Sequence, residues 1–291
     1  MLDRLVLRRA DVTAYALVLA SAFLHAAWNA LVKKSADPTA AVHAVVAAAG
    51  VVAAAVAVVE LAVVPGTTLT ARAAVLGAVA GALEAGYFQT LGRALAAGPL
   101  GPVYTISRGT AAIAVWPISI VALGEKLTLF SGAGSALVLA GLAASSLERG
   151  TSRTAVLWAL ATAAFIAGYH FAYKAALLTG SSPALIFCVA IAVAAGLGAI
   201  LEGTRYRRAL AGAVANAPLG TLGGGVICAA AFLLFMYALQ DGGAGYVFTL
   251  RNTSVLWATA LAFTIGDRPG PRQLAGAALV FAGAALMGLG R

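Results

Sequence analysis

Three ionisable residues lie deep inside long apolar stretches of the sequence: Glu84, Arg108 and Arg251. A charged side chain at the middle of a bilayer costs roughly 2.5–3.5 kcal/mol on insertion scales, so each needs a partner or a function. Glu84 could bind and release a proton, or pair with a cationic substrate. The arginines could hold a carboxylate or phosphonate through their planar guanidinium groups. Alternatively, one arginine neutralises Glu84 and the other bonds backbone carbonyls.

Two arginines against a single deep acid leave one positive charge without a counterpart, which favours an anionic or zwitterionic small-molecule substrate. Two tyrosines stand close to these charges along the chain. Tyr87 lies one helical turn after Glu84, and Tyr104 lies one turn before Arg108. We therefore expect both tyrosines to contact the substrate.

Two further groups have the spacing i, i+3 and i+4, which places side chains on one face of a helix. They are His25, Trp28 and Asn29, and His170, Tyr173 and Lys174. In lipid, such a polar and aromatic stripe should face the interior of a helix bundle, so we expect these residues to line a cavity. The alternative is anchoring at the membrane surface, where aromatic and basic residues gather. Tyr237 and Gln240, at the end of an apolar stretch, are candidates for a gate.

The elements that must position these residues are predicted by the apolar pattern. Of the 291 residues, 62% are hydrophobic and 10% are charged, which is too few polar residues for the surface of a soluble domain. Apolar residues run in blocks of about 18–24 residues, the length of a membrane-spanning helix. The expected spans are 12–32, 40–63, 73–92, 101–123, 128–147, 154–175, 183–201, 218–239, 244–265 and 271–290.

The chain contains an internal repeat. Gly134-Ser-Ala-Leu-Val-Leu-Ala-Gly141 matches Gly276-Ala-Ala-Leu-Val-Phe-Ala-Gly283, 142 residues further on. We therefore predict two related five-helix halves, residues 1–148 and 149–291. Because five is odd, the second half enters the membrane from the opposite side, so the fold class is an all-α integral membrane protein of about ten helices in two inverted repeats. Secondary transporters often have this architecture, with the substrate site between the repeats. The alternative is duplication for packing alone.

Charge and motifs narrow the function. The net charge of +9 resides in short loops, which favours contact with lipid headgroups and not with nucleic acid. The sequence has no nucleotide-binding loop, metal motif or cofactor motif, so we predict a secondary transporter that is not an enzyme and has no cofactor. An intramembrane enzyme acting on a lipid-linked substrate, or a membrane assembly subunit without transport, are the alternatives.

The paired Gly124-Glu-Lys126 and Gly266-Asp-Arg268 loops, each followed by the repeated glycine motif, resemble the EamA-type repeat of the drug/metabolite transporter superfamily. The resemblance covers essentially the whole chain and includes Gly101-Pro-Val-Tyr-Thr105 and Gly245-Tyr-Val-Phe-Thr249. It implies a carrier of the bacterial inner membrane that moves a small metabolite, with export as the expected direction, and both termini in the cytoplasm. The count of loop arginines and lysines favours the opposite orientation. The protein could act as a monomer or a homodimer.

Overall fold

The computed structural model describes the backbone of residues 2–124, 126, 128–146, 151–264, 266 and 268–289. In these residues the chain is helical and no strand occurs. The helices are α1 (Leu2–Lys34), α2 (Pro38–Val63), α3 (Ala71–Ala97), α4 (Leu100–Leu123), α5 (Leu129–Ser146), α6 (Arg153–Leu177), α7 (Pro183–Glu202), α8 (Thr204–Asn216), α9 (Pro218–Asp241), α10 (Ala244–Arg251), α11 (Ser254–Thr264) and α12 (Pro271–Leu289).

Local sequence sets where several helices begin. Asp37 caps α2 by accepting a hydrogen bond from the Ala40 amide at 3.0 Å, and Pro38 follows it. Ser182 caps α7 in the same way, accepting from the Leu185 amide at 3.3 Å, and is again followed by a proline. A side-chain acceptor followed by proline is a strong helix start, because proline has no amide hydrogen to satisfy.

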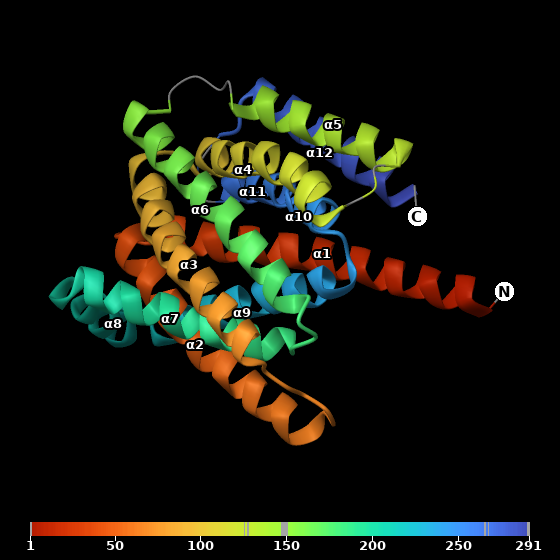
Figure 1. Ribbon diagram of the computed structural model, residues 1–291. Helices are drawn as coiled ribbons and strands as arrows, with labels where there is room; N and C mark the ends of the chain where they lie inside the picture. The colour runs from red at the N-terminus through yellow and green to blue at the C-terminus, as the bar shows by residue number, and fades with distance from the viewer. Residues whose placement is uncertain are drawn as a thin grey trace.

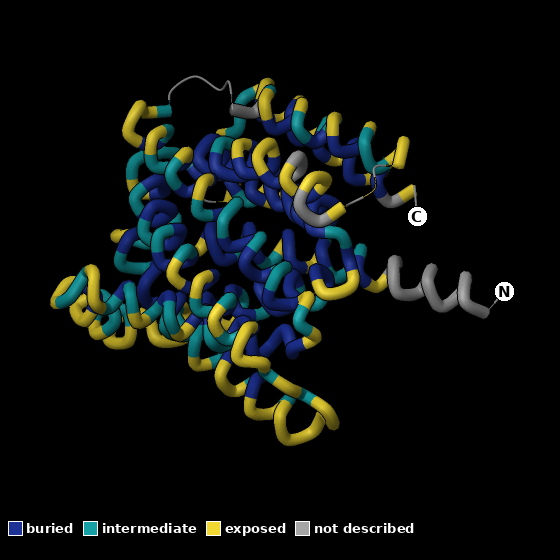
Figure 2. The backbone as a smooth tube through the Cα atoms, viewed as in Figure 1, coloured by how far each residue is buried: buried dark blue, intermediate teal, exposed yellow. Residues whose placement is uncertain are grey.

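The chain is a multi-pass membrane protein. Within the described residues, five helical segments are long and apolar enough to cross a bilayer: Thr13–Lys34, Pro38–Val63, Arg153–Leu177, Pro183–Glu202 and Pro218–Asp241. Large apolar side chains such as Val51, Val75 and Phe281 are exposed on the outside, and buried residues concentrate along the middle of the bundle (Figure 2). An apolar exterior around a buried interior is what lipid contact requires.

The repeated glycine motif holds α5 against α12, which lie side by side at one edge of the bundle (Figure 1). A methyl group added to Gly283 would lie 2.5 Å from the carbonyl oxygen of Gly134. A methyl group added to Gly141 would lie 2.5 Å from the carbonyl oxygen of Gly276. The two backbones thus approach too closely for any side chain, and each end of one motif meets the opposite end of the other.

Two expected features differ from the structure. The expected span 244–265 is interrupted: α10 ends at Arg251 and α11 begins at Ser254, with Asn252 and Thr253 in a turn between them. The segment 202–217, expected as a loop, contains the helix α8. Hydropathy alone could not show either feature, because average hydropathy registers neither a two-residue turn within an apolar stretch nor the periodicity of an amphipathic helix. The expected boundary between the halves, at 148 and 149, and the loop acids Glu125 and Asp267 lie outside the described residues.

Candidate functional site

The ten residues predicted to bind substrate are all buried, each with 2% or less of its surface exposed. They come from five helices that meet inside the bundle: His25, Trp28 and Asn29 on α1; Glu84 and Tyr87 on α3; Tyr104 and Arg108 on α4; His170 and Tyr173 on α6; and Arg251 on α10. None of the ten stands at the exposed rim, where anchoring residues would lie. We call this set the central cluster.

His25 connects three helices of the central cluster. Its Nδ1 lies 3.1 Å from an Arg251 guanidinium nitrogen, and its Nε2 lies 3.3 Å from the Tyr87 hydroxyl. Trp28 also donates to Nδ1, at 3.3 Å. Because arginine and indole nitrogens can only donate, Nδ1 must be an acceptor, and the ring proton therefore resides on Nε2 and faces Tyr87. His25 is thus a neutral imidazole that orients Arg251.

Arg251 has capacity for a further anionic partner. Its guanidinium lies 4.1 Å from the ring centre of Phe235 and 4.9 Å from that of Phe232, both on α9. Its Nε and Nη1 atoms have no hydrogen-bond acceptor in the described part of the chain. The aromatic faces hold the cation in place by cation–π attraction, while the remaining donors stay available.

Arg108 is held in a similar manner. Its guanidinium lies 5.3 Å from the ring centre of Tyr104, one turn earlier on α4. Both of its terminal nitrogens lack a hydrogen-bond acceptor among the described residues. Two buried guanidinium groups therefore present unused donors inside the bundle, and a planar oxyanion can accept two parallel hydrogen bonds from such a group.

Glu84 does not pair with either arginine. Neither of its carboxylate oxygens has a hydrogen-bond partner within the described residues. The Tyr173 hydroxyl lies beside the carboxyl group but outside the geometry of a formed hydrogen bond. The ion pair considered as a structural alternative is thus not formed in this structure. Burying an ionised carboxylate without a partner costs several kcal/mol of free energy, so Glu84 must bind a proton or a cation whenever water is excluded from the site.

Tyr169 belongs to this cluster although it was not among the predicted residues. It is fully buried, stacks on His170 with ring centres 4.4 Å apart, and contacts the Tyr87 ring at 5.5 Å. Its place one turn before Tyr173 was the signal in the sequence. Asn252 and Ser254, at the break between α10 and α11, were also missed; their side-chain polar atoms are buried without partners in the described chain.

Asn29 and His170 use side-chain hydrogen bonds to satisfy their own helices. Asn29 donates to the His25 carbonyl oxygen of its own helix at 2.7 Å. The Nδ1 atom of His170 lies 2.6 Å from the Ile166 carbonyl oxygen, and its ring packs against Phe248 with centres 4.3 Å apart. No group of three histidine, cysteine, aspartate or glutamate residues able to hold a metal ion occurs among the described residues.

Comparison with known proteins gives a family match over the second half of the chain. Residues 153–289 match the EamA-like transporter family, which confirms the predicted resemblance over that half. None of the curated proteins compared with the chain matches it. A solved structure described only as "Crystal structure of protein" has a TM-score of 0.66 and 20% identity, over 97% of this chain and 98% of that chain. At this identity the likeness shows the fold alone.

Proposed function

We propose, from the fact that residues 153–289 belong to the EamA-like transporter family, that the chain is a secondary transporter of a small metabolite working by alternating access. The observation that carries the proposal is the central cluster. It contains two guanidinium groups and one carboxylate, all buried and all with unused hydrogen-bonding capacity within the described residues. A purely structural interior would pair these charges with one another. A transport site must instead keep them available for a ligand.

The two predicted inverted five-helix repeats, residues 1–148 and 149–291, are part of this proposal. Lys33, at the end of α1, donates to the carbonyl oxygens of Leu95 and Gly98 at 2.9 Å each. Lys174 near the end of α6 donates to those of Leu239 and Gly242, at 2.8 and 2.9 Å. In each half, a lysine near the end of the first predicted span thus caps the C-terminal end of the third predicted span, which is α3 in the first half and α9 in the second. A cation is favourable at a helix C-terminus.

The break between α10 and α11 supports a site at this position. We propose that the two short helices together form one membrane crossing, which brings the total to about ten. Discontinuous helices in transporters place polar backbone and side chains at the substrate site, since irregular backbone within a membrane is tolerated where it is buried in protein or lines a cavity. Arg251 is the last residue of α10, immediately before the break.

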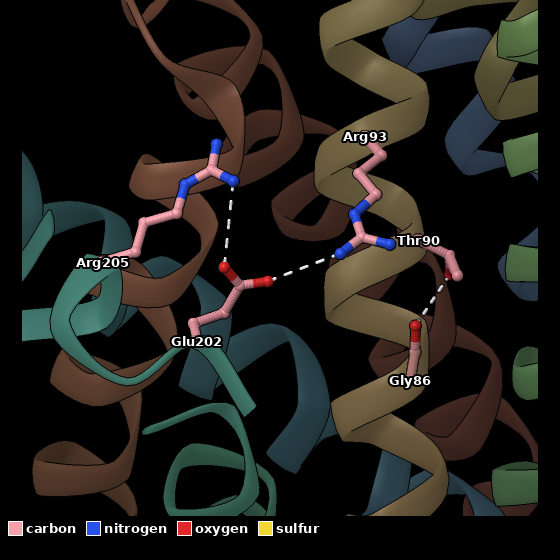
Figure 3. A network of polar contacts seen from close by, with 5 residues as sticks. All are labelled: Gly86, Thr90, Arg93, Glu202 and Arg205. Atoms are coloured by element: carbon pink, nitrogen blue, oxygen red, sulfur yellow. Dashed lines mark hydrogen bonds and ion pairs between the residues drawn. The ribbon is translucent and has the colours of Figure 1, made fainter. Parts of the chain in front are cut away.

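A pair of equivalent contacts would control access from the two ends. Glu60, near the end of α2, accepts hydrogen bonds from Ser182 at 2.7 Å and Tyr237 at 2.8 Å. Glu202, which ends α7, lies between Arg93 on α3 at 3.5 Å and Arg205 on α8 at 3.9 Å (Figure 3). The 20 residues of α7 separate the two contacts by about 30 Å. Each joins one half to the other, so we assign them as opposing gates.

Opening one gate should expose the interior to one side only. We expect Glu60→Ala to expose the interior at the end where α2 finishes, and Glu202→Ala to expose it at the opposite end. Each hydrogen bond to the Glu60 carboxylate contributes ~1.5–3 kcal/mol, enough to shift a balanced equilibrium about tenfold or more. The ion pairs of Glu202 involve exposed arginines and contribute ~0–1 kcal/mol, so Glu202→Ala should give the smaller shift. Cys228, which is fully buried and close to Glu84, is a natural reporter.

The measurement is labelling of Cys228 by a membrane-impermeant maleimide, applied from each side of oriented vesicles in a Cys188→Ser background. Each variant is the control for the other, because both remove a carboxylate at a helix end. Opposite sidedness of labelling supports the gates. Equal labelling from both sides, or no change from the parent protein, would show that these contacts only stabilise the fold.

The transport proposal itself is tested by ligand binding and flux. The central cluster contains two guanidinium groups and one carboxylate, so positive charge is in excess there. We therefore expect carboxylates, phosphonates or zwitterions to raise the melting temperature of the detergent-purified protein, and organic cations to have no effect. Binding to the folded state alone raises stability by mass action. Any stabilising compound is then followed into proteoliposomes as a labelled substrate. Binding without flux would favour a non-transporting subunit, and stabilisation by cations alone would contradict an anionic or zwitterionic substrate.

The proposal includes a setting for the transporter. We place it in the bacterial inner membrane with both termini in the cytoplasm. We propose that it exports its substrate, driven either by coupling to proton movement or by exchange for another solute. The polar residues of the gates and the central cluster come from both halves of one chain, so a monomer contains the whole site. A homodimer is the alternative arrangement.

A further inference from the structure

A second cavity lies apart from the central cluster, at the end of the bundle where α1 finishes. It has a volume of about 460 Å³ and is bounded by the ends of α1, α2, α8 and α9. Clefts that hold small molecules have volumes of ~300–1,000 Å³. We call this cavity the α8 groove.

Small residues make the α8 groove. Ala40 and Ala44 on α2 face Gly212 and Ala213 on α8, and Gly220 on α9 completes the wall. With only hydrogen atoms or methyl groups at these positions, no side chain fills the space between the helices. Most of the surface of the groove is apolar, although Ser35, Asn216 and Thr221 also line it, so an apolar group fills it better than water does. At the edge of a bilayer, the hydrocarbon chain of a lipid is the apolar group at hand.

The rim of the α8 groove is basic on its α8 side. Arg208 lines the cavity, and the neighbouring Arg207 is exposed beside it. No carboxylate lies within 4 Å of either guanidinium among the residues that the structure describes, whereas Arg205 approaches Glu202 at 3.9 Å. On the same helix Tyr206 is buried against the bundle. A short helix with a basic outer face and an apolar inner face lies in the interfacial plane of a membrane and attracts anionic headgroups.

We propose that the α8 groove binds an anionic glycerophospholipid, with an acyl chain between α2, α8 and α9 and the phosphodiester on Arg208. The opposite rim contains Asp37, whose carboxylate accepts the Ala40 amide as the cap of α2. The Asp37 carboxylate would repel a phosphate, so the favourable place for the phosphate is the α8 side, beside Arg208. Such a lipid ties α8, which begins two residues after Glu202, to the start of α2. The lipid site does not depend on the transport proposal.

The test is native mass spectrometry of the delipidated full chain titrated with phosphatidylglycerol, phosphatidylethanolamine or phosphatidylcholine in mixed micelles. We expect phosphatidylglycerol to bind at least tenfold more tightly than phosphatidylcholine. Arg208→Gln should weaken this binding about tenfold, since it removes a charge-assisted contact to the phosphate. Gly212→Leu should displace the acyl chain, because the nearest atom to an added Cβ there is 4.0 Å away and the side chain can enter the groove without a backbone clash.

Matched controls separate the site from general effects of charge and bulk. Arg153→Gln removes another exposed arginine, at the start of α6, and Gly196→Leu adds the same bulk at an exposed glycine of α7 with nothing within 4 Å of its Cβ. Both should bind phosphatidylglycerol as the parent does. The proposal is overturned if Arg208→Gln and Gly212→Leu bind like the controls, or if the zwitterionic lipids bind as tightly as phosphatidylglycerol.

Discussion

Replacing Arg251 with methionine should weaken substrate binding about 10- to 100-fold and reduce transport accordingly. Hydrogen bonds from a charged donor contribute ~1.5–3 kcal/mol, and each 1.4 kcal/mol corresponds to a factor of ten in affinity. The Nε and Nη1 donors of Arg251 have no acceptor among the described residues, so a bound anion is the partner that the variant would lose. Methionine keeps an unbranched apolar chain in the bundle but not the cation–π contact of the guanidinium with Phe232 and Phe235.

Arg251→Lys provides the sharper comparison. Lysine retains the positive charge but not the planar fork, so substrate binding should recover only in part if two parallel hydrogen bonds are made. Equilibrium binding in detergent measures the effect, and Arg153→Met is the control because Arg153 is exposed at the start of α6. Arg108→Met should give a loss of the same kind. Normal affinity in both the Arg108 and Arg251 variants would show that the arginines serve the fold and not the substrate.

The sequence was sufficient to predict the helical membrane fold and the burial of the central cluster. Apolar blocks of spanning length leave few places for a charge, so Glu84, Arg108 and Arg251 had to face the interior. The spacing of His25, Trp28 and Asn29 likewise predicted one polar face. These inferences work because they depend on local periodicity and on the cost of charge in lipid, and both can be evaluated from residue types alone.

Contacts between segments that are distant along the chain could not be predicted from the sequence. Glu60 accepts a hydrogen bond from Tyr237, which is 177 residues away along the chain. Nothing local to either residue indicates that contact. The pairing of Arg251 with His25, across 226 residues, was equally invisible. The internal repeat could have suggested that Glu60 and Glu202 occupy equivalent positions, since they are 142 residues apart. What each contacts depends on how the two halves pack.

Replacing Glu84 with glutamine should abolish the coupling of transport to protons while leaving the protein folded. Glutamine has nearly the same shape, and the Glu84 oxygens accept no hydrogen bond from the described residues that the change would remove. It cannot exchange a proton, however, so a transport cycle that depends on loading and releasing one at Glu84 should lose its dependence on the pH gradient. Exchange of substrate across the membrane, which needs no net proton movement, should persist.

The measurement for Glu84→Gln is substrate-driven proton movement in proteoliposomes, followed with an internal pH-sensitive dye, together with substrate exchange at several fixed pH values. Asp241→Asn is the control, since it removes an exposed acid at the end of α9. Exchange without proton movement in Glu84→Gln, with both retained in Asp241→Asn, would assign the coupling to Glu84. Proton movement of parental size in Glu84→Gln would refute that assignment. In that case Glu84 could still be the counter-ion of a cationic substrate group, and the variant should then bind zwitterions more weakly than simple anions.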